Sequence, residues 1–105
     1  PIPEVVSQSV EFPTGASGTT VEGFADDTVI RRYLVRAAAG QVLQVEVLDG
    51  NVRLDIRRPN GQLVADAAGV LYWEAVLNRN GDYVVDVVAG SETGYSVNIQ
   101  VLDTE

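Results

Sequence analysis

Apolar and polar residues alternate with a period of two through most of this 105-residue chain, and turn residues interrupt the alternation. Successive side chains of a β-strand point to opposite faces, so this pattern predicts half-buried strands. Turns roughly every 8 to 12 residues predict an all-β antiparallel sandwich of about eight strands. The length suits one domain over 1–105, with 1–7 as an extended lead-in and a first strand over 7–12. The residues predicted to face the core are Tyr33, Val35, Ala37, Leu43, Val45, Val47, Val52, Leu54, Ile56, Trp73, Ala75, Leu77, Tyr83, Val85, Val87, Tyr95, Val97, Ile99 and Val101.

Segment 72–88 gives the strongest local prediction of strand pairing. Two runs rich in Val and aromatic residues flank 78–82, whose Asn-Gly step tolerates the positive φ of a tight turn. The segment is therefore expected to form an antiparallel hairpin with Glu74 and Asp86 on its polar face. Residues 49–51 predict another hairpin-type turn.

Missing residue types exclude most catalytic chemistry. The chain has no His, Cys or Met, and all seven basic residues are Arg. Catalytic triads, zinc sites of the usual type, haem ligation and Schiff bases are thereby excluded. A carboxylate pair, either Asp82 with Asp86 or Glu74 with Asp86, is the remaining catalytic possibility. A solvated acidic surface is the favoured interpretation, so we expect no enzyme.

The net charge of −8 bears on the choice of partner. Phosphate binding needs clustered cations, so nucleic acid and anionic lipid are unfavoured partners. No apolar run approaches the roughly 20 residues of a membrane helix, and we expect no membrane insertion. A basic protein is the partner that this charge suits.

An exposed apolar group is expected beside the arginines. Tyr72 and Trp73 are adjacent and must face opposite sides of their strand, which exposes Tyr72 if Trp73 is buried. Val76 and Val84 are predicted on the same outer face as Tyr72. Tyr, Val and Leu with Arg nearby are typical of protein interfaces. The predicted binding residues are Arg32, Leu34, Arg36, Tyr72 and Val84.

A family resemblance runs through nearly the whole chain. It is carried by Tyr33, Val35, Ala37, Ala39, Gly40, Gln41, Leu43, Val45, Pro59, Gly61, Leu77, Gly81, Asp82, Tyr83, Val85, Val87, Tyr95, Val97 and Ile99. These residues resemble the bacterial pre-peptidase C-terminal (PPC) domain. The resemblance implies a secreted β-sandwich of jelly-roll type without catalytic activity, often attached to an exported enzyme. The front end is similar to the periplasmic inhibitors of goose-type (g-type) lysozyme, through Val10, Glu11, Phe12, Gly15, Ser17, Gly23 and Phe24.

The resemblance also raises the question of calcium. Some PPC domains bind calcium through acidic residues just before the strand that corresponds to Tyr33. Here only Asp26 and Asp27 lie near that place. Calcium takes six to eight oxygens, and adjacent side chains on an extended chain point apart. A polar corner is therefore favoured, and no cofactor is expected.

Three functional hypotheses follow. The first is a non-catalytic accessory or binding domain of a secreted or periplasmic bacterial protein. The second is a free-standing periplasmic inhibitor of g-type lysozyme, for which an acidic surface would suit a basic enzyme. The third is an extracellular structural subunit that self-associates by exchanging residues 2–12 as a donated strand.

Overall fold

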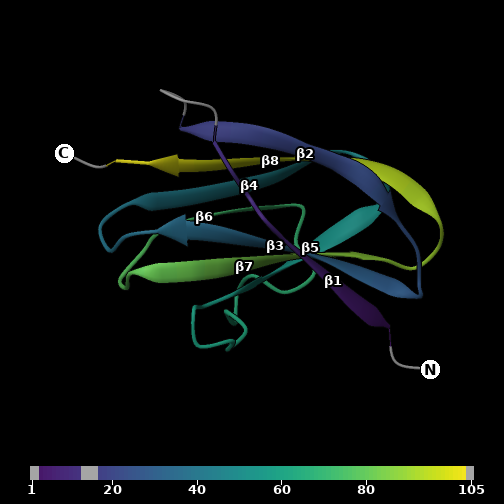
Figure 1. Ribbon diagram of the computed structural model, residues 1–105, viewed down its shortest axis with the longest axis horizontal. Coiled ribbons are helices and arrows are strands. Elements are labelled where there is room, and N and C mark those ends of the chain that lie inside the picture. Colours follow the sequence, from purple (N-terminus) through teal and green to yellow (C-terminus); the bar gives the residue numbers. More distant parts are fainter. Residues whose placement is uncertain (1–2, 13–16, 104–105) are drawn as a thin grey trace.

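The computed structural model describes residues 3–12 and 17–103, which contain eight β-strands (Figure 1). They are β1 (Glu4–Ser9), β2 (Gly18–Ala25), β3 (Val29–Ala37), β4 (Val42–Asp49), β5 (Val52–Arg57), β6 (Tyr72–Val76), β7 (Gly81–Ala89) and β8 (Thr93–Leu102). Sheet A has the order β1-β3-β7-β5, and sheet B has the order β2-β8-β4-β6. The predicted all-β sandwich is confirmed.

Consecutive strands never share a sheet, because odd-numbered strands form sheet A and even-numbered strands form sheet B. The predicted hairpin over 72–88 is therefore wrong: β6 pairs with β4, whereas β7 pairs with β3 and β5. Residues 49–51 likewise join strands of different sheets. Two strands joined by such a corner lie in different sheets, but each still packs one face against the same core. Their sequences therefore show the same alternation of apolar and polar residues as the two strands of a hairpin.

Gly81 does have the backbone conformation that its sequence predicts. Its φ is +144°, and a Cβ added there would lie 2.8 Å from the side chain of Pro59. Glycine is thus required at this position by both the backbone and the close approach of Pro59. The Asn-Gly step starts β7 after a corner instead of closing a hairpin.

The core lies between the sheets and contains the side chains predicted to face inward, together with Ala25, Val64, Ala67 and Ala89, which were not among the predicted residues. Most are buried, while Val47, Ala75 and Val101 are partly buried and pack against the others. Tyr33 of β3 and Tyr95 of β8 meet in this layer, with their hydroxyl oxygens 2.6 Å apart. This hydrogen bond links the two sheets through the core.

Strand β1 departs from the sequence prediction. The first strand was expected over 7–12, but it spans Glu4–Ser9 and runs parallel to β3. All six residues are exposed. Because neither face of β1 is buried, its sequence need not alternate between apolar and polar residues, and the strand could not be recognised from such a pattern. Val10 and Phe12 pack against the core as expected. The predictions for Ile2, Pro13, Gly15 and 104–105 lie outside the described residues.

The segment 58–70 covers the outer edge of β5. Val64 N–H donates to the Ile56 carbonyl over 2.9 Å, and Leu54 N–H donates to the Val70 carbonyl over 2.8 Å. These bonds occupy backbone groups that an edge strand would otherwise expose to another chain. In the part of the chain described here, no helix is long and apolar enough to cross a membrane.

Candidate protein-binding faces

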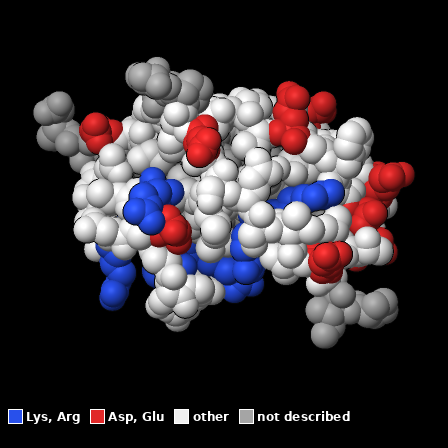
Figure 2. Space-filling view, in the orientation of Figure 1, with Lys and Arg blue, Asp and Glu red and all other residues white. Residues whose placement is uncertain are grey.

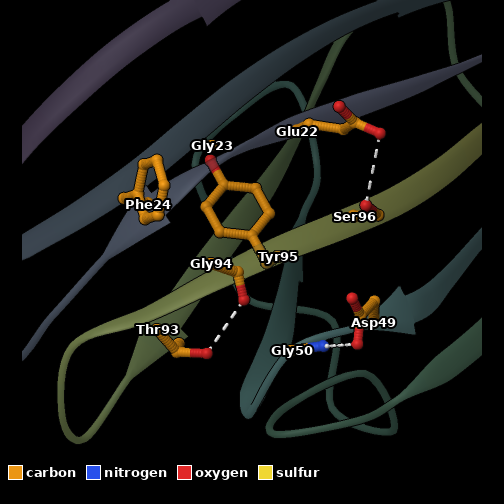
Figure 3. A pocket seen from close by; sticks show the side chains of 9 residues that line it. All are labelled: Glu22, Gly23, Phe24, Asp49, Gly50, Thr93, Gly94, Tyr95 and Ser96. Carbon is orange, nitrogen blue, oxygen red and sulfur yellow. Dashed lines mark hydrogen bonds between the residues drawn. The ribbon is translucent and has the colours of Figure 1, made fainter.

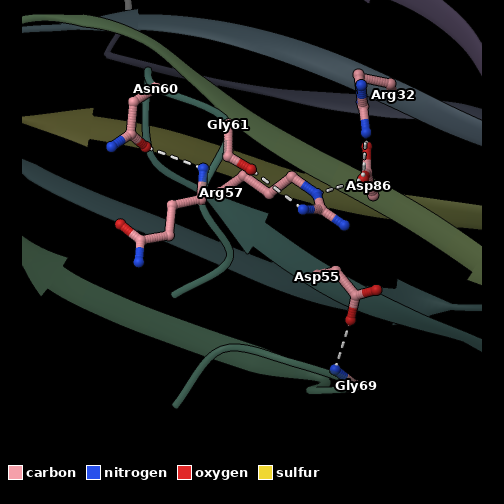
Figure 4. A network of polar contacts seen from close by, with 8 residues as sticks. Arg32, Asp55, Arg57, Asn60, Gly61, Gly69 and Asp86 are labelled. Atoms are coloured by element: carbon pink, nitrogen blue, oxygen red, sulfur yellow. Dashed lines mark hydrogen bonds and ion pairs between the residues drawn. The ribbon is translucent and has the colours of Figure 1, made fainter. Parts of the chain in front are cut away.

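Asp86 occupies the centre of the outer face of sheet A (Figure 4). It lies on β7, and Arg32 of the adjacent β3 approaches it through Nε at 2.8 Å and Nη2 at 3.0 Å. Arg57 Nε of β5 donates over 3.3 Å to Oδ2, the oxygen that Arg32 Nη2 also contacts. The residue is only 2% exposed although it is on an outer face, because two arginines cover it.

The contacts of Asp86 with Arg32 and Arg57 link three strands of sheet A. Arg57 also donates to the Gly61 carbonyl over 3.1 Å, which ties β5 to the covering segment. The hydrogen bonds that Arg32 donates to Asp86 raise the pKa of Arg32, with burial acting in the opposite direction. The group therefore stays ionised and holds β3, β7 and β5 together by charge-assisted bonds.

Four of the five predicted binding residues lie on this face of sheet A. Leu34 is registered with Val84, and Arg36 pairs with Asp82 over 3.3 Å at an exposed position near the edge of the face. Val84 was predicted to be exposed but is only 8% exposed, because it lies on a central strand between Leu34 and Arg57. Val84 therefore offers little apolar surface to a partner.

Tyr72 does not join that group. It lies on β6 of sheet B, so the prediction of one outer face shared by Tyr72 and Val84 is wrong. The cause is the hairpin that the structure lacks, since a true hairpin would have placed both side chains on one surface. Whether any of the five residues binds a partner stays a prediction.

The structure also separates the carboxylates considered for catalysis. Glu74 belongs to β6 and Asp86 to β7, and they lie on the outer faces of opposite sheets. Asp82 and Asp86 share a face, but each is paired with arginine. Glu74 and Asp86 are therefore too far apart to act as one acid/base pair.

The outer face of sheet B differs from that of sheet A in charge. The four strands of sheet B contain no Arg, whereas those of sheet A contain five of the seven arginines. In Figure 2 the basic side chains lie mainly across the centre and lower border, and acidic ones along the upper and right-hand borders. We name the surface of sheet B formed by Glu22, Phe24, Glu46, Leu48, Asp49, Tyr72, Glu74 and Val76 the acidic face.

Carboxylates and exposed apolar side chains are mixed on the acidic face. Phe24 is 71% exposed and Val76 is 65% exposed, and Leu48 and Tyr72 are about half exposed. The Tyr72 hydroxyl accepts from Gln44 over 3.0 Å and donates to Glu74 over 2.8 Å, which fixes its ring. None of the carboxylates of this face forms an ion pair with another described residue. Their charge is therefore available to a partner.

A shallow hollow of about 680 Å³ opens at the β2 side of the acidic face (Figure 3). Its floor is Gly94 and Ser96 of β8. Phe24 and Glu22 flank it on β2, and Asp49 flanks it at the end of β4.

Asp26 and Asp27 form the predicted polar corner between β2 and β3. Asp26 Oδ1 accepts from the Thr28 hydroxyl and, over 2.8 Å, from the Thr28 backbone N–H. These hydrogen bonds, the one to the hydroxyl first, lower the pKa of Asp26. Within residues 3–12 and 17–103, no three acidic groups converge as a metal site would require. Calcium binding itself stays untested.

Sequence reasoning missed the acidic face, although its signal is present in the chain. The residues of β2, β4, β6 and β8 include Glu22, Glu46, Asp49 and Glu74 but no Arg. Sorting charges strand by strand would have shown this asymmetry. Recognising one continuous face also required knowing that these four strands form one sheet, which local patterns do not reveal.

The β-sandwich fold of this chain is similar to that of solved structures. No protein-family model and no curated protein sequence matches the chain, so the PPC assignment stays a prediction. Aeromonas hydrophila PliG, a periplasmic inhibitor of g-type lysozyme, aligns with a TM-score of 0.80 and 20% identity over 93% of this chain and 97% of its own.

Two further structures have the same description. Salmonella Typhimurium PliG gives a TM-score of 0.72 at 20% identity, over 90% of this chain and 96% of its own. A mutant of the Escherichia coli PliG gives 0.70 at 18% identity, over 96% and 99%. At this level of identity the similarity shows that the fold is shared.

Proposed function

We propose that this chain is a bacterial periplasmic or secreted protein that binds g-type lysozyme and inhibits it without catalysing a reaction. The observation that carries the proposal is the structural similarity to three PliG inhibitors over at least 90% of both chains in each comparison. The similarity favours the inhibitor hypothesis over the accessory-domain hypothesis, because the three aligned structures are all described as lysozyme inhibitors.

The acidic face is the surface that we assign to lysozyme binding. A basic enzyme is attracted by unpaired carboxylates, which raise the rate of association. Phe24, Tyr72 and Val76 supply the apolar contact area that slows dissociation. The outer face of sheet A suits this task less, since its central carboxylate is already bound by Arg32 and Arg57.

A lysis assay tests the proposal. The purified chain is added in rising molar ratio to a g-type lysozyme acting on a bacterial cell suspension, and the loss of turbidity is followed. We expect inhibition that saturates near one chain per enzyme molecule, and no inhibition of a c-type lysozyme at the same ratio. Full g-type activity at a tenfold excess of the chain would reject the proposal.

Equal inhibition of both lysozymes would also reject it, because that result indicates general attraction between an acidic and a basic protein. Heat-denatured chain at the same concentration is the matched control, since it carries the same charge without the folded acidic face.

A further inference from the structure

The hollow on the acidic face combines an aromatic ring with two carboxylates around a floor of small residues (Figure 3). In the register of sheet B, Phe24 is opposite Gly94, Glu22 is opposite Ser96, and Asp49 pairs with Ser96 from the other side. The row Glu22, Ser96, Asp49 thus places a carboxylate on each side of a short side chain. The space above Ser96 and Gly94 is bounded by negative charge.

Gly94 has no side chain although its backbone would permit one. Its φ lies outside the left-handed region, unlike that of Gly50. A Cβ at Gly94 would meet only the Phe24 ring at 3.4 Å and more distant atoms, which is ordinary contact. Glycine inside a strand weakens it and often marks a place where another group approaches the backbone closely.

The carboxylates beside the hollow retain free acceptor capacity. Asp49 Oδ1 accepts from the Gly50 N–H over 2.9 Å, and Glu22 has a long contact of 3.5 Å with the Ser96 hydroxyl. Arg31 donates to the Phe24 carbonyl over 2.9 Å and lines an adjacent hollow, which shares Phe24, with Asp26 and Glu92. No described cation therefore fills the space between Phe24 and Asp49.

We infer that this hollow receives a single arginine side chain of the partner protein. A guanidinium can stack on the Phe24 ring and donate to the carboxylates of Asp49 and Glu22 at once. Arginine is favoured over lysine because its planar group offers several donors and a face for stacking. The inference deepens the proposed function, on which it rests for the identity of the partner as a lysozyme.

A small probe tests the hollow without the enzyme. N-acetyl-arginine amide is titrated into the ¹⁵N-labelled chain at low ionic strength, and amide shifts are compared with those caused by the neutral citrulline analogue. We expect arginine to shift the amides of Gly50, Gly94 and Ser96, with no matching shift from citrulline. Asp49→Asn should weaken the binding at least fivefold.

Gly94→Val fills the floor of the hollow and keeps both carboxylates, so it should also weaken arginine binding at least fivefold. Glu74→Gln removes one charge of the same face far from the hollow and is the matched control, expected to change binding less than twofold. Folding of each variant is checked by its spectrum. Shifts spread evenly over the acidic face, equal losses in all three variants, or no shifts at all would overturn the inference.

The two proposals can fail separately. If arginine binds in the hollow but g-type lysozyme is not inhibited, the proposed function is rejected, and the hollow is retained as an arginine site for another basic partner. If lysozyme is inhibited but Gly94→Val and Asp49→Asn inhibit as well as the wild type, the arginine site falls and the proposed function stands.

Discussion

Asp86 shows how a charged residue can become structural in this molecule. The sequence places it on an outward position of β7, where a solvated carboxylate was expected. Instead, Arg32 and Arg57 cover it from the neighbouring strands. The apolar parts of arginine side chains exclude water while their guanidinium groups satisfy the carboxylate. Long side chains on adjacent strands produce this burial, and the alternation pattern of one strand does not reveal it.

The two aspartates of β7 offer a matched test. Asp86→Asn leaves two arginines without their shared carboxylate and should lower the free energy of unfolding by about 2 kcal/mol. Asp82→Asn removes an exposed pair with Arg36 and should cost less than about 0.5 kcal/mol. Urea denaturation at neutral pH measures both values. Equal losses in the two variants would show that the Asp86 network adds no special stability.

Tyr95 gives a pH test at the same scale. Burial, and then the hydrogen bond with Tyr33, raise its pKa above the usual value of about 10. An unfolded chain loses this proton first, so the free energy of unfolding should fall as pH rises above about 10. Tyr95→Phe should be less stable at neutral pH, by about 1 to 3 kcal/mol, and show a shallower alkaline decline. If the free energy of unfolding of Tyr95→Phe fell with pH as steeply as that of the wild type, the alkaline decline would be due to other groups.

Strands and their inner faces could be predicted from the sequence, whereas their partners could not. Val35, Leu54 and Ile99 were placed in the core because each lies on the apolar phase of an alternating run. Pairing failed because the turn before Gly81 looks the same whether the next strand stays in the sheet or crosses to the other. The same error placed Tyr72 and Val84 on one face, although they lie on different sheets, so the candidate site was predicted only in part.

Strand β1 is the element expected to open most easily. It pairs only with β3, and all six residues are exposed, so little apolar burial holds it. In native-state hydrogen exchange we expect its ladder amides to be protected about 100-fold less than those of β7, the central strand of the same sheet. Equal protection would mean that β1 opens only with global unfolding, which would also weigh against exchange of 2–12 between copies.

At the scale of the whole molecule, the main feature is the uneven distribution of charge between the two sheets. A net charge of −8 could be spread evenly, yet the strands of sheet B carry carboxylates and no arginine while sheet A is rich in arginine. The two outer faces therefore present different chemistry to a partner. We propose that lysozyme is bound through the acidic face, where carboxylates surround exposed Phe24, Leu48, Tyr72 and Val76.

A pair of charge reversals tests that claim most directly. Glu46→Arg changes an exposed residue at the centre of the acidic face, and Asp66→Arg makes the same change of charge in the segment that covers β5. The measurement is the concentration of each variant that halves g-type lysozyme activity. We expect an increase of at least tenfold for Glu46→Arg and less than threefold for Asp66→Arg. Equal increases would reduce the effect to net charge, and an unchanged value for Glu46→Arg would contradict binding through this face.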